Sequence, residues 1–287
     1  MIFTYITLVL RILSNPIANA FQKKIVQFNS ATVSNFYTYA LMSLCVMPFA
    51  LKTNWAELPP DVYTNAFIAG LLCSTGTACL IKALQSGDLS VLGPINSYKC
   101  IIGLFTAFFL LHEIPTFLGI LGMILIIFGS WFVFDATDEG FSLKLFTRRD
   151  IQLRFLALLL TGIEAAFLKK VIILSSPLIS FYLWCFSGAI FSFVLIILFR
   201  KNLEKVSLKT CKYYITVALC LGIMQFSTNY IFDRMNVGFA LALFQLSTLV
   251  TLFLGFKMFN EKDMKKKLIG TIIMVLGSIM ILSKSFG

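Results

Sequence analysis

The sequence predicts an all-α integral membrane protein with ten transmembrane helices arranged as two inverted five-helix repeats. Three observations predict it: an apolar composition, a series of apolar segments of membrane-spanning length, and a similarity between the two halves of the chain. Of the 287 residues, 59% are hydrophobic and only 13% are charged, whereas soluble domains carry about 25% charged residues. The composition therefore excludes a soluble fold.

Ten apolar segments follow one another along the chain, separated mostly by short polar turns. A helix needs about 20 apolar residues to cross the hydrocarbon core, and it satisfies its own backbone hydrogen bonds there. The breaks carry turn residues, as in "LPPD" at 58–61 and "SSP" at 175–177. The predicted spans are 2–26, 32–51, 63–84, 89–111, 115–134, 152–174, 177–199, 212–233, 237–258 and 268–284.

The first segment ends in "ANAFQKKIV" at 18–26, whose A-x-A triplet also resembles a secretory cleavage site. However, no basic residue precedes the apolar run, because Arg11 is its first positive charge. In addition, "AFQKKIV" at 20–26 matches "AFLKKVI" at 166–172 in the sixth segment. A removed signal has no reason to share a motif with a later span, so we expect the first helix to be retained.

The two halves of the chain align at a nearly constant shift. A shift of 148 residues pairs 105–130 with 253–278 without a gap. Scarce residues then coincide: Glu113 with Glu261, Gly122 with Gly270, and Gly129 with Gly277. Because each half holds an odd number of spans, the second must enter the membrane from the opposite side. We therefore expect a first repeat at 1–134, a connecting loop at 135–150 and a second repeat at 151–287.

The paired glycines have a structural interpretation. Gly122 and Gly129, like Gly270 and Gly277, are seven residues apart and so share one helix face. Missing side chains let two helix backbones approach closely in lipid. We expect these residues to serve helix packing.

Three segments resemble the EamA-type members of the drug/metabolite transporter superfamily. They are the "AFQKKIV" and "AFLKKVI" pair, the turn "KALQSGDLSVLGPINS" at 82–97, and "FLLHEIPTFLGILGMILIIFGS" at 109–130. The family's Gly in the last turn is replaced by Leu111-His112 in one half and by Phe259-Asn260 in the other. The resemblance implies ten helices in two inverted repeats, with a central cavity lined by the first, fourth, sixth and ninth helices among others.

Ionisable side chains at mid-membrane depth are costly and should face a cavity or a partner. Arg11, Lys99 and Glu164 are the main examples, whereas Lys82 lies near a span end and can extend to the interface. Lys99 and Glu164 are interpreted either as a buried ion pair that fixes packing or as groups that bind charged substrate or relay a proton. The predicted substrate-binding residues are Arg11, Asn15, Asn19, Tyr98, Lys99, Glu164, Tyr230 and Gln245.

These features predict a secondary active transporter that moves a small polar metabolite, an amino acid or a related zwitterion or anion, by alternating access. The chain holds no G-x-x-x-x-G-K-[ST] motif, so a gradient, of protons for example, or substrate exchange must supply the energy. We expect no cofactor, no metal and no enzymatic activity. The alternative is an intramembrane enzyme acting on lipid or lipid-linked sugar, with His112-Glu113 as its candidate cluster.

We interpret the net charge of +11 as Lys and Arg residues in loops that contact anionic lipid, and not as a sign of nucleic-acid binding. We expect a multi-pass protein of the cell (inner) membrane, either a monomer or a homodimer. Orientation stays open. Most loop Lys and Arg residues, with Arg154 and Lys267 counted among them, fall on one side and would place both termini outside the cytoplasm. The resemblance favours the opposite orientation.

Overall fold

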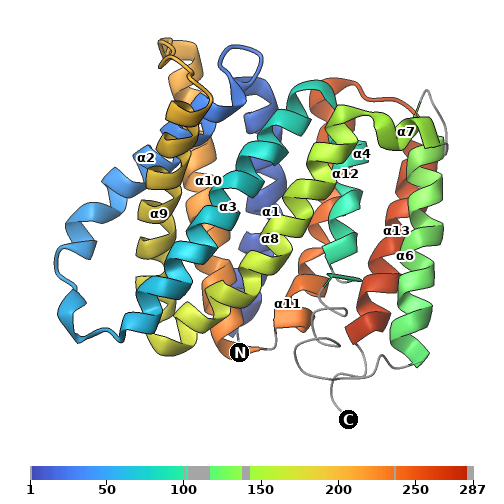
Figure 1. The fold of residues 1–287 in the computed structure, drawn as a ribbon. Coiled ribbons are helices and arrows are strands. Elements are labelled where there is room, and N and C mark those ends of the chain that lie inside the picture. Colours follow the sequence, from blue (N-terminus) through green and yellow to red (C-terminus); the bar gives the residue numbers. More distant parts are fainter. Residues whose placement is uncertain (1, 100, 103–116, 138–142, 236, 283–287) are drawn as a thin grey trace.

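Every regular element in the computed structural model is a helix, over the residues that it describes: 2–99, 101–102, 117–137, 143–235 and 237–282 (Figure 1). The first half contains α1 (Ile2–Ile25), α2 (Ala31–Ala50), the 3-10 helix η1 (Trp55–Glu57), α3 (Pro60–Ser86), α4 (Leu89–Leu92), the 3-10 helix η2 (Pro94–Ser97) and α6 (Phe117–Asp135). The second half contains α7 (Leu143–Thr147), α8 (Arg149–Leu174), α9 (Pro177–Leu198), α10 (Leu208–Arg234), α11 (Val237–Phe244), α12 (Ser247–Phe259) and α13 (Met264–Leu282).

Local sequence explains where several helices begin. Pro60 and Pro177 occupy the first turns of α3 and α9, where the missing proline N–H costs nothing. The hydroxyl of Ser176 accepts a hydrogen bond from the Ile179 N–H at 3.1 Å, and that of Ser207 accepts one from Thr210 at 3.2 Å. Both are N-caps, so α10 starts four residues before the predicted span at 212.

The fourth and ninth segments are broken, although the sequence predicts continuous spans at 89–111 and 237–258. In the fourth, α4 ends at Leu92 and η2 begins at Pro94, which lacks an N–H and restricts the residue before it. In the ninth, the Gln245 N–H turns to the Ala242 carbonyl at 2.9 Å, and the Gln245 side chain takes over the Leu241 carbonyl, also at 2.9 Å. A glutamine side chain therefore replaces a helical hydrogen bond between α11 and α12.

Helices that correspond in the two repeats pack in corresponding ways. α3 lies along α8, and its counterpart α10 lies along α1. α2 packs against its counterpart α9, and α6 against its counterpart α13, at opposite ends of the molecule in Figure 1. The broken segments lie between these pairs, where α12 contacts both α1 and α4. This arrangement brings the breaks into the centre of the helix bundle.

The contact between α6 and α13 confirms the interpretation of the paired glycines. A Cβ atom on Gly129 would lie 2.6 Å from the Gly270 carbonyl oxygen, and one on Gly277 would lie 2.6 Å from that of Gly122. The helices therefore run antiparallel. Gly129 contacts Gly270, the repeat equivalent of Gly122, and Gly122 contacts Gly277, the repeat equivalent of Gly129. Only glycine permits so close an approach of the two backbones.

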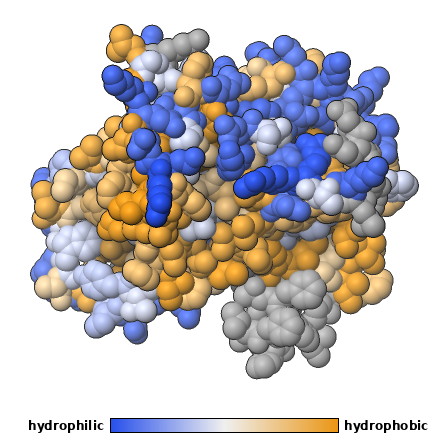
Figure 2. All heavy atoms as spheres, turned by 45° about the horizontal axis from the view of Figure 1, so that its top comes forward, coloured by the Kyte–Doolittle hydropathy of each residue, from blue (hydrophilic) through white to orange (hydrophobic). Residues whose placement is uncertain are grey.

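Within the part of the chain that the structure describes, five stretches are long and apolar enough to cross a membrane: Pro60–Ser86, Phe117–Asp135, Pro177–Leu198, Thr210–Arg234 and Ala240–Phe259. The other predicted spans stay predictions. Figure 2 shows hydrophilic residues gathered at the upper end of the molecule, above a surface dominated by hydrophobic residues. Exposed apolar side chains of the molecule include Phe67, Ile124 and Ile190. An apolar surface of this kind is suited to contact with lipid.

Candidate functional site

Glu164 lies in the middle of α8 and is only 7% exposed. Its carboxylate lies close enough to the thiol of Cys73 on α3 for the two groups to interact electrostatically. The Cys73 sulfur in turn lies 3.1 Å from Trp184 Nε1 and 3.3 Å from the Tyr39 hydroxyl. The second carboxylate oxygen, Oε1, is buried and has no hydrogen-bond partner. This carboxylate is therefore buried with one oxygen unsatisfied.

Lys99 follows η2 and is half-buried. Its ammonium interacts electrostatically with Glu164 first, and then with Arg154 and Arg11. Within the described residues, Lys99 and Glu164 form no direct ion pair. The two residues that the sequence singled out therefore lie near enough for their charges to interact.

Arg11 reaches from α1 towards the second repeat. Its Nε donates a hydrogen bond to Thr228 Oγ1 on α10 at 2.8 Å. The guanidinium carbon lies 4.4 Å from the centre of the Phe244 ring, a cation–π contact beside the break at Gln245. Its Nη1 is buried and has no hydrogen-bond partner.

Arg154 joins this group, contrary to its assignment to a loop in the sequence analysis. It lies in the second turn of α8 and is 6% exposed. Its Nε donates to the Leu92 carbonyl at 2.7 Å, and its Nη2 donates to Asn96 Oδ1 at 3.1 Å. Asn96 donates on to Gln245 Oε1 at 3.4 Å. A chain of polar contacts therefore links α8 to both broken segments.

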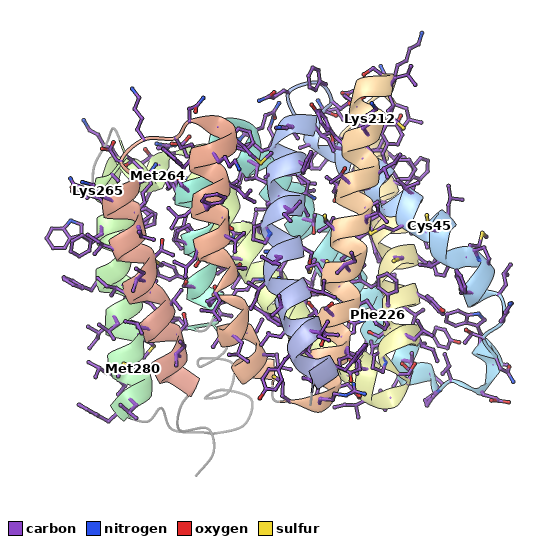
Figure 3. The ribbon with its side chains drawn as sticks, turned by 180° about the vertical axis from the view of Figure 1, so that it is seen from behind. Cys45, Lys212, Phe226, Met264, Lys265 and Met280 are labelled. Atoms are coloured by element: carbon purple, nitrogen blue, oxygen red, sulfur yellow. The ribbon has the colours of Figure 1, made fainter. Side chains whose placement is uncertain are left out.

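The signal for Arg154 was present in the sequence. The predicted sixth span begins at 152, so an arginine at 154 already lies inside it. The other loop charges contrast with it: Lys212 at the start of α10 and Lys265 at the start of α13 are exposed and point away from the bundle (Figure 3).

The remaining predicted site residues divide into two sets. Asn15 and Asn19 are half-buried on the α1 face that carries Arg11, and their side chains form no hydrogen bond within the described chain. Gln245 is fully buried at the break between α11 and α12. Asn15 and Asn19 thus share a helix face with Arg11, and Gln245 follows Phe244, whose ring Arg11 contacts.

Tyr98 and Tyr230 have other contacts. The Tyr98 hydroxyl donates to Ser130 Oγ on α6 at 2.8 Å. Tyr230 meets Phe3 edge-on near the end of α10, and the exposed Arg234 lies 3.5 Å over its ring. Lys82 is exposed and bonded to Gln85. His112-Glu113, the candidate cluster of the enzymatic alternative, lies outside the described residues.

A second polar cluster closes one end of the bundle. Lys23 Nζ, at the end of α1, lies 2.9 Å from Glu261 Oε1 in the turn between α12 and α13. The Glu261 carboxylate also accepts the backbone N–H groups of Leu89 and Ser90, both at 2.8 Å, and so caps α4. Lys267, 2% exposed, donates to Ser90 Oγ at 3.0 Å.

The charge state of Glu261 follows from these contacts. Burial raises the pKa of Glu261, but attraction to Lys23 and the hydrogen bonds from Lys23 and Ser90 outweigh burial, so the pKa lies below its ordinary value of 4.5. Glu261 is therefore an anion at neutral pH. Lys267, which the sequence analysis treated as a loop charge, is part of this packed cluster together with Lys23.

Comparison with known proteins extends these observations. A comparison with curated proteins returns no match. Solved structures share the fold: one described as "Crystal structure of protein" superposes with a TM-score of 0.69, over 96% of this chain and 95% of that one, at 14% sequence identity.

The family model described as the EamA-like transporter family matches the chain twice, over residues 2–135 and 150–283. The two matches cover nearly the whole chain and correspond to a two-repeat architecture. Such transporters act on small molecules in a lipid environment. The chain therefore belongs to the EamA-like transporter family, multi-pass membrane transporters of the drug/metabolite transporter superfamily.

Proposed function

We propose that this chain is a secondary active transporter that carries a small polar metabolite, an amino acid or a related zwitterion or anion, across the cell (inner) membrane. Ten spans form two inverted repeats, residues 1–134 and 151–287, joined by 135–150. Substrate passes by alternating access through a central cavity between the repeats, and the protein has no enzymatic activity. The antiparallel crossing of α6 and α13 supports the inverted arrangement, because equivalent helices of two such repeats run in opposite directions.

One observation carries the proposal. Charged side chains from both repeats, Arg11 and Lys99 in the first and Glu164 in the second, meet beside the two broken segments. Buried charges in a membrane protein are costly and mark substrate or ion pathways. Broken helices at mid-depth expose backbone groups that can contact a polar substrate.

The buried carboxylate of Glu164 could couple substrate transport to proton movement. One oxygen of Glu164 has no hydrogen-bond partner, and the carboxylate interacts electrostatically with Lys99. Proton uptake or substrate binding at this carboxylate would therefore change the net charge around Lys99. Exchange of one metabolite for another is the alternative energy source for transport. In either case the Lys23–Glu261 cluster closes one end of the bundle, and alternating access requires that this end opens.

Uptake by purified protein tests the proposal. The full chain is reconstituted into liposomes and offered a pool of metabolites across an imposed pH gradient, and the trapped compounds are identified by mass spectrometry. We expect saturable accumulation of at least one polar metabolite, reduced at least tenfold by Glu164→Gln. The matched control is Lys212→Gln, which removes an exposed charge and should transport normally. Absence of saturable uptake with gradient or with preloaded exchange substrate would contradict the proposal.

A further inference from the structure

The polar centre of the bundle holds more positive than negative charge. Lys99 and Glu164 offset each other, whereas Arg11 and Arg154 have only neutral hydrogen-bond partners. Asp150, one turn before Arg154 on α8, is bonded instead to Arg148 at 2.8 Å. Three cations against one carboxylate leave a surplus of two positive charges among the described residues of the centre.

An unpaired buried charge is expensive, and a guanidinium loses much of that cost when a carboxylate or phosphate binds it. Arg11 has a donor in place for such a group. Its Nε is held by Thr228 and its plane lies over Phe244, while Nη1 is buried without a partner. The side chain is thus fixed by neutral contacts with a donor unused, the state in which an arginine can bind an oxyanion.

Arg154 and Glu164 lie at different depths in the bundle. Arg154 precedes Glu164 by ten residues on α8, which is about 15 Å along the helix axis. It therefore lies nearer the upper end of the bundle in Figure 1, where α8 begins. Lys99 interacts electrostatically with both Arg154 and Arg11. An anion entering from that end would meet Arg154 before it reached the depth of Glu164.

We propose that the transported metabolite is an anion whose carboxylate or phosphate group binds Arg11, and that Arg154 and Lys99 select for negative charge on the approach from the end where α8 begins. The inference rests on the proposed transport function and names its substrate class. Asn15 and Asn19, on the same face as Arg11 and with open hydrogen-bonding capacity, orient the rest of the molecule. Arg154, held by Leu92 and Asn96, is a specificity-determining residue.

Ligand-induced stabilisation of the purified full chain tests the charge selection, because a ligand that binds the folded state raises the apparent melting temperature. Four probes are compared: succinate, its neutral analogue succinamide, the cation 1,4-diaminobutane, and inorganic phosphate. We expect a saturable rise with succinate or with phosphate, and the difference between them identifies which oxyanion is preferred. Succinamide and 1,4-diaminobutane should have no effect.

Variants then locate the binding. Arg11→Gln and Arg154→Gln should each weaken the apparent affinity about tenfold or more, the loss expected for a charged hydrogen bond. Arg154→Lys, which keeps the charge, should recover most of it, and Lys212→Gln should change nothing. If Arg11→Gln does not fold, Arg11→Lys replaces it, because this variant keeps the charge and loses the fork that binds an oxyanion in two places. Anion binding that survives both arginine substitutions would overturn the inference.

The liposome assay separates the two levels of the proposal. Saturable uptake of neutral or cationic metabolites alone would overturn the anion inference and leave the transporter intact. No uptake of any metabolite would contradict the transporter function itself. Uptake of anions that is lost in Arg11→Gln and reduced in Arg154→Gln is the expected result.

Discussion

Lys23 and Glu261 form an ion pair of 2.9 Å between the end of α1 and the turn that joins α12 to α13. The same carboxylate accepts two backbone N–H groups at the start of α4, so one side chain connects three elements drawn from both repeats. The Glu261 side chain is only 3% exposed. This pair therefore contributes to stability by holding the three elements together.

Removing the Glu261 carboxylate should be strongly destabilising. Glu261→Ala leaves the two N–H groups at the start of α4 without their partner and leaves Lys23 with only the exposed Asp88 carboxylate, 4.0 Å away. Breaking a buried pair costs about 3 to 5 kcal/mol in free energy of unfolding. Denaturant unfolding of the purified protein in detergent measures the loss. The matched control is Lys266→Met, which removes an ion pair of 2.8 Å with Asp135 that is exposed on both sides. That variant should unfold like the wild type.

Acid should weaken the same cluster. The pKa of Glu261 is lowered in the folded protein, so its contribution to stability is present above the ordinary pKa of 4.5 and is lost as pH falls through the lower folded value. The apparent melting temperature of the wild type should therefore fall below about pH 4.5 more steeply than that of Glu261→Gln, which cannot titrate there. Parallel pH profiles for the two proteins would show that Glu261 has no role in acid stability.

Close packing of α6 and α13 should not tolerate an added methyl group. Gly129→Ala places a Cβ 2.6 Å from the Gly270 carbonyl, and overpacking of this kind costs about 1 to 3 kcal/mol. Gly222→Ala is the control, because its nearest neighbour, Phe181 Cζ, lies 3.9 Å away. It should be neutral or slightly stabilising, since alanine favours helix more than glycine does. Thermal unfolding of the two variants gives the comparison, and equal stability would contradict the backbone contact.

Lys99 and Glu164 allow a test that separates packing from transport. Lys99→Met and Glu164→Gln each leave the other group without its electrostatic partner, so each should lower stability. The double variant should recover part of that loss, with a coupling of about 0.5 to 3 kcal/mol. We expect its uptake activity to stay absent. A double variant with full stability and full uptake would assign the two residues to packing alone.

Much of the helix packing could be predicted from the sequence, because scarce residues repeated in register carry information that apolar letters do not. Gly122, Gly129, Gly270 and Gly277 led to the correct backbone contact. Glu261 was recognised as a repeated acid, but its contacts with Lys23 and the start of α4 depend on tertiary placement that periodicity does not contain.

The site was predicted less completely. Arg154 looked like a loop charge because it lies near a helix end, yet packing of α8 against the broken fourth segment buries it. Both breaks were missed, although Pro94 marks one of them. The break at Gln245 carries no Pro or Gly and depends on a side-chain amide that takes the place of a backbone donor. Tyr98 and Tyr230 were chosen by residue type and depth, neither of which fixes the direction of a side chain.

The glycine contact between α6 and α13 has the reciprocity of an interface in a symmetric dimer. Gly129 contacts Gly270, which is the repeat equivalent of Gly122, and Gly122 contacts Gly277, which is the repeat equivalent of Gly129. A single unit of half this length, inserted into the membrane in both orientations, would already make the same contact with a copy of itself. The two halves of this chain, produced as separate polypeptides, thus retain the surface through which they recognise each other.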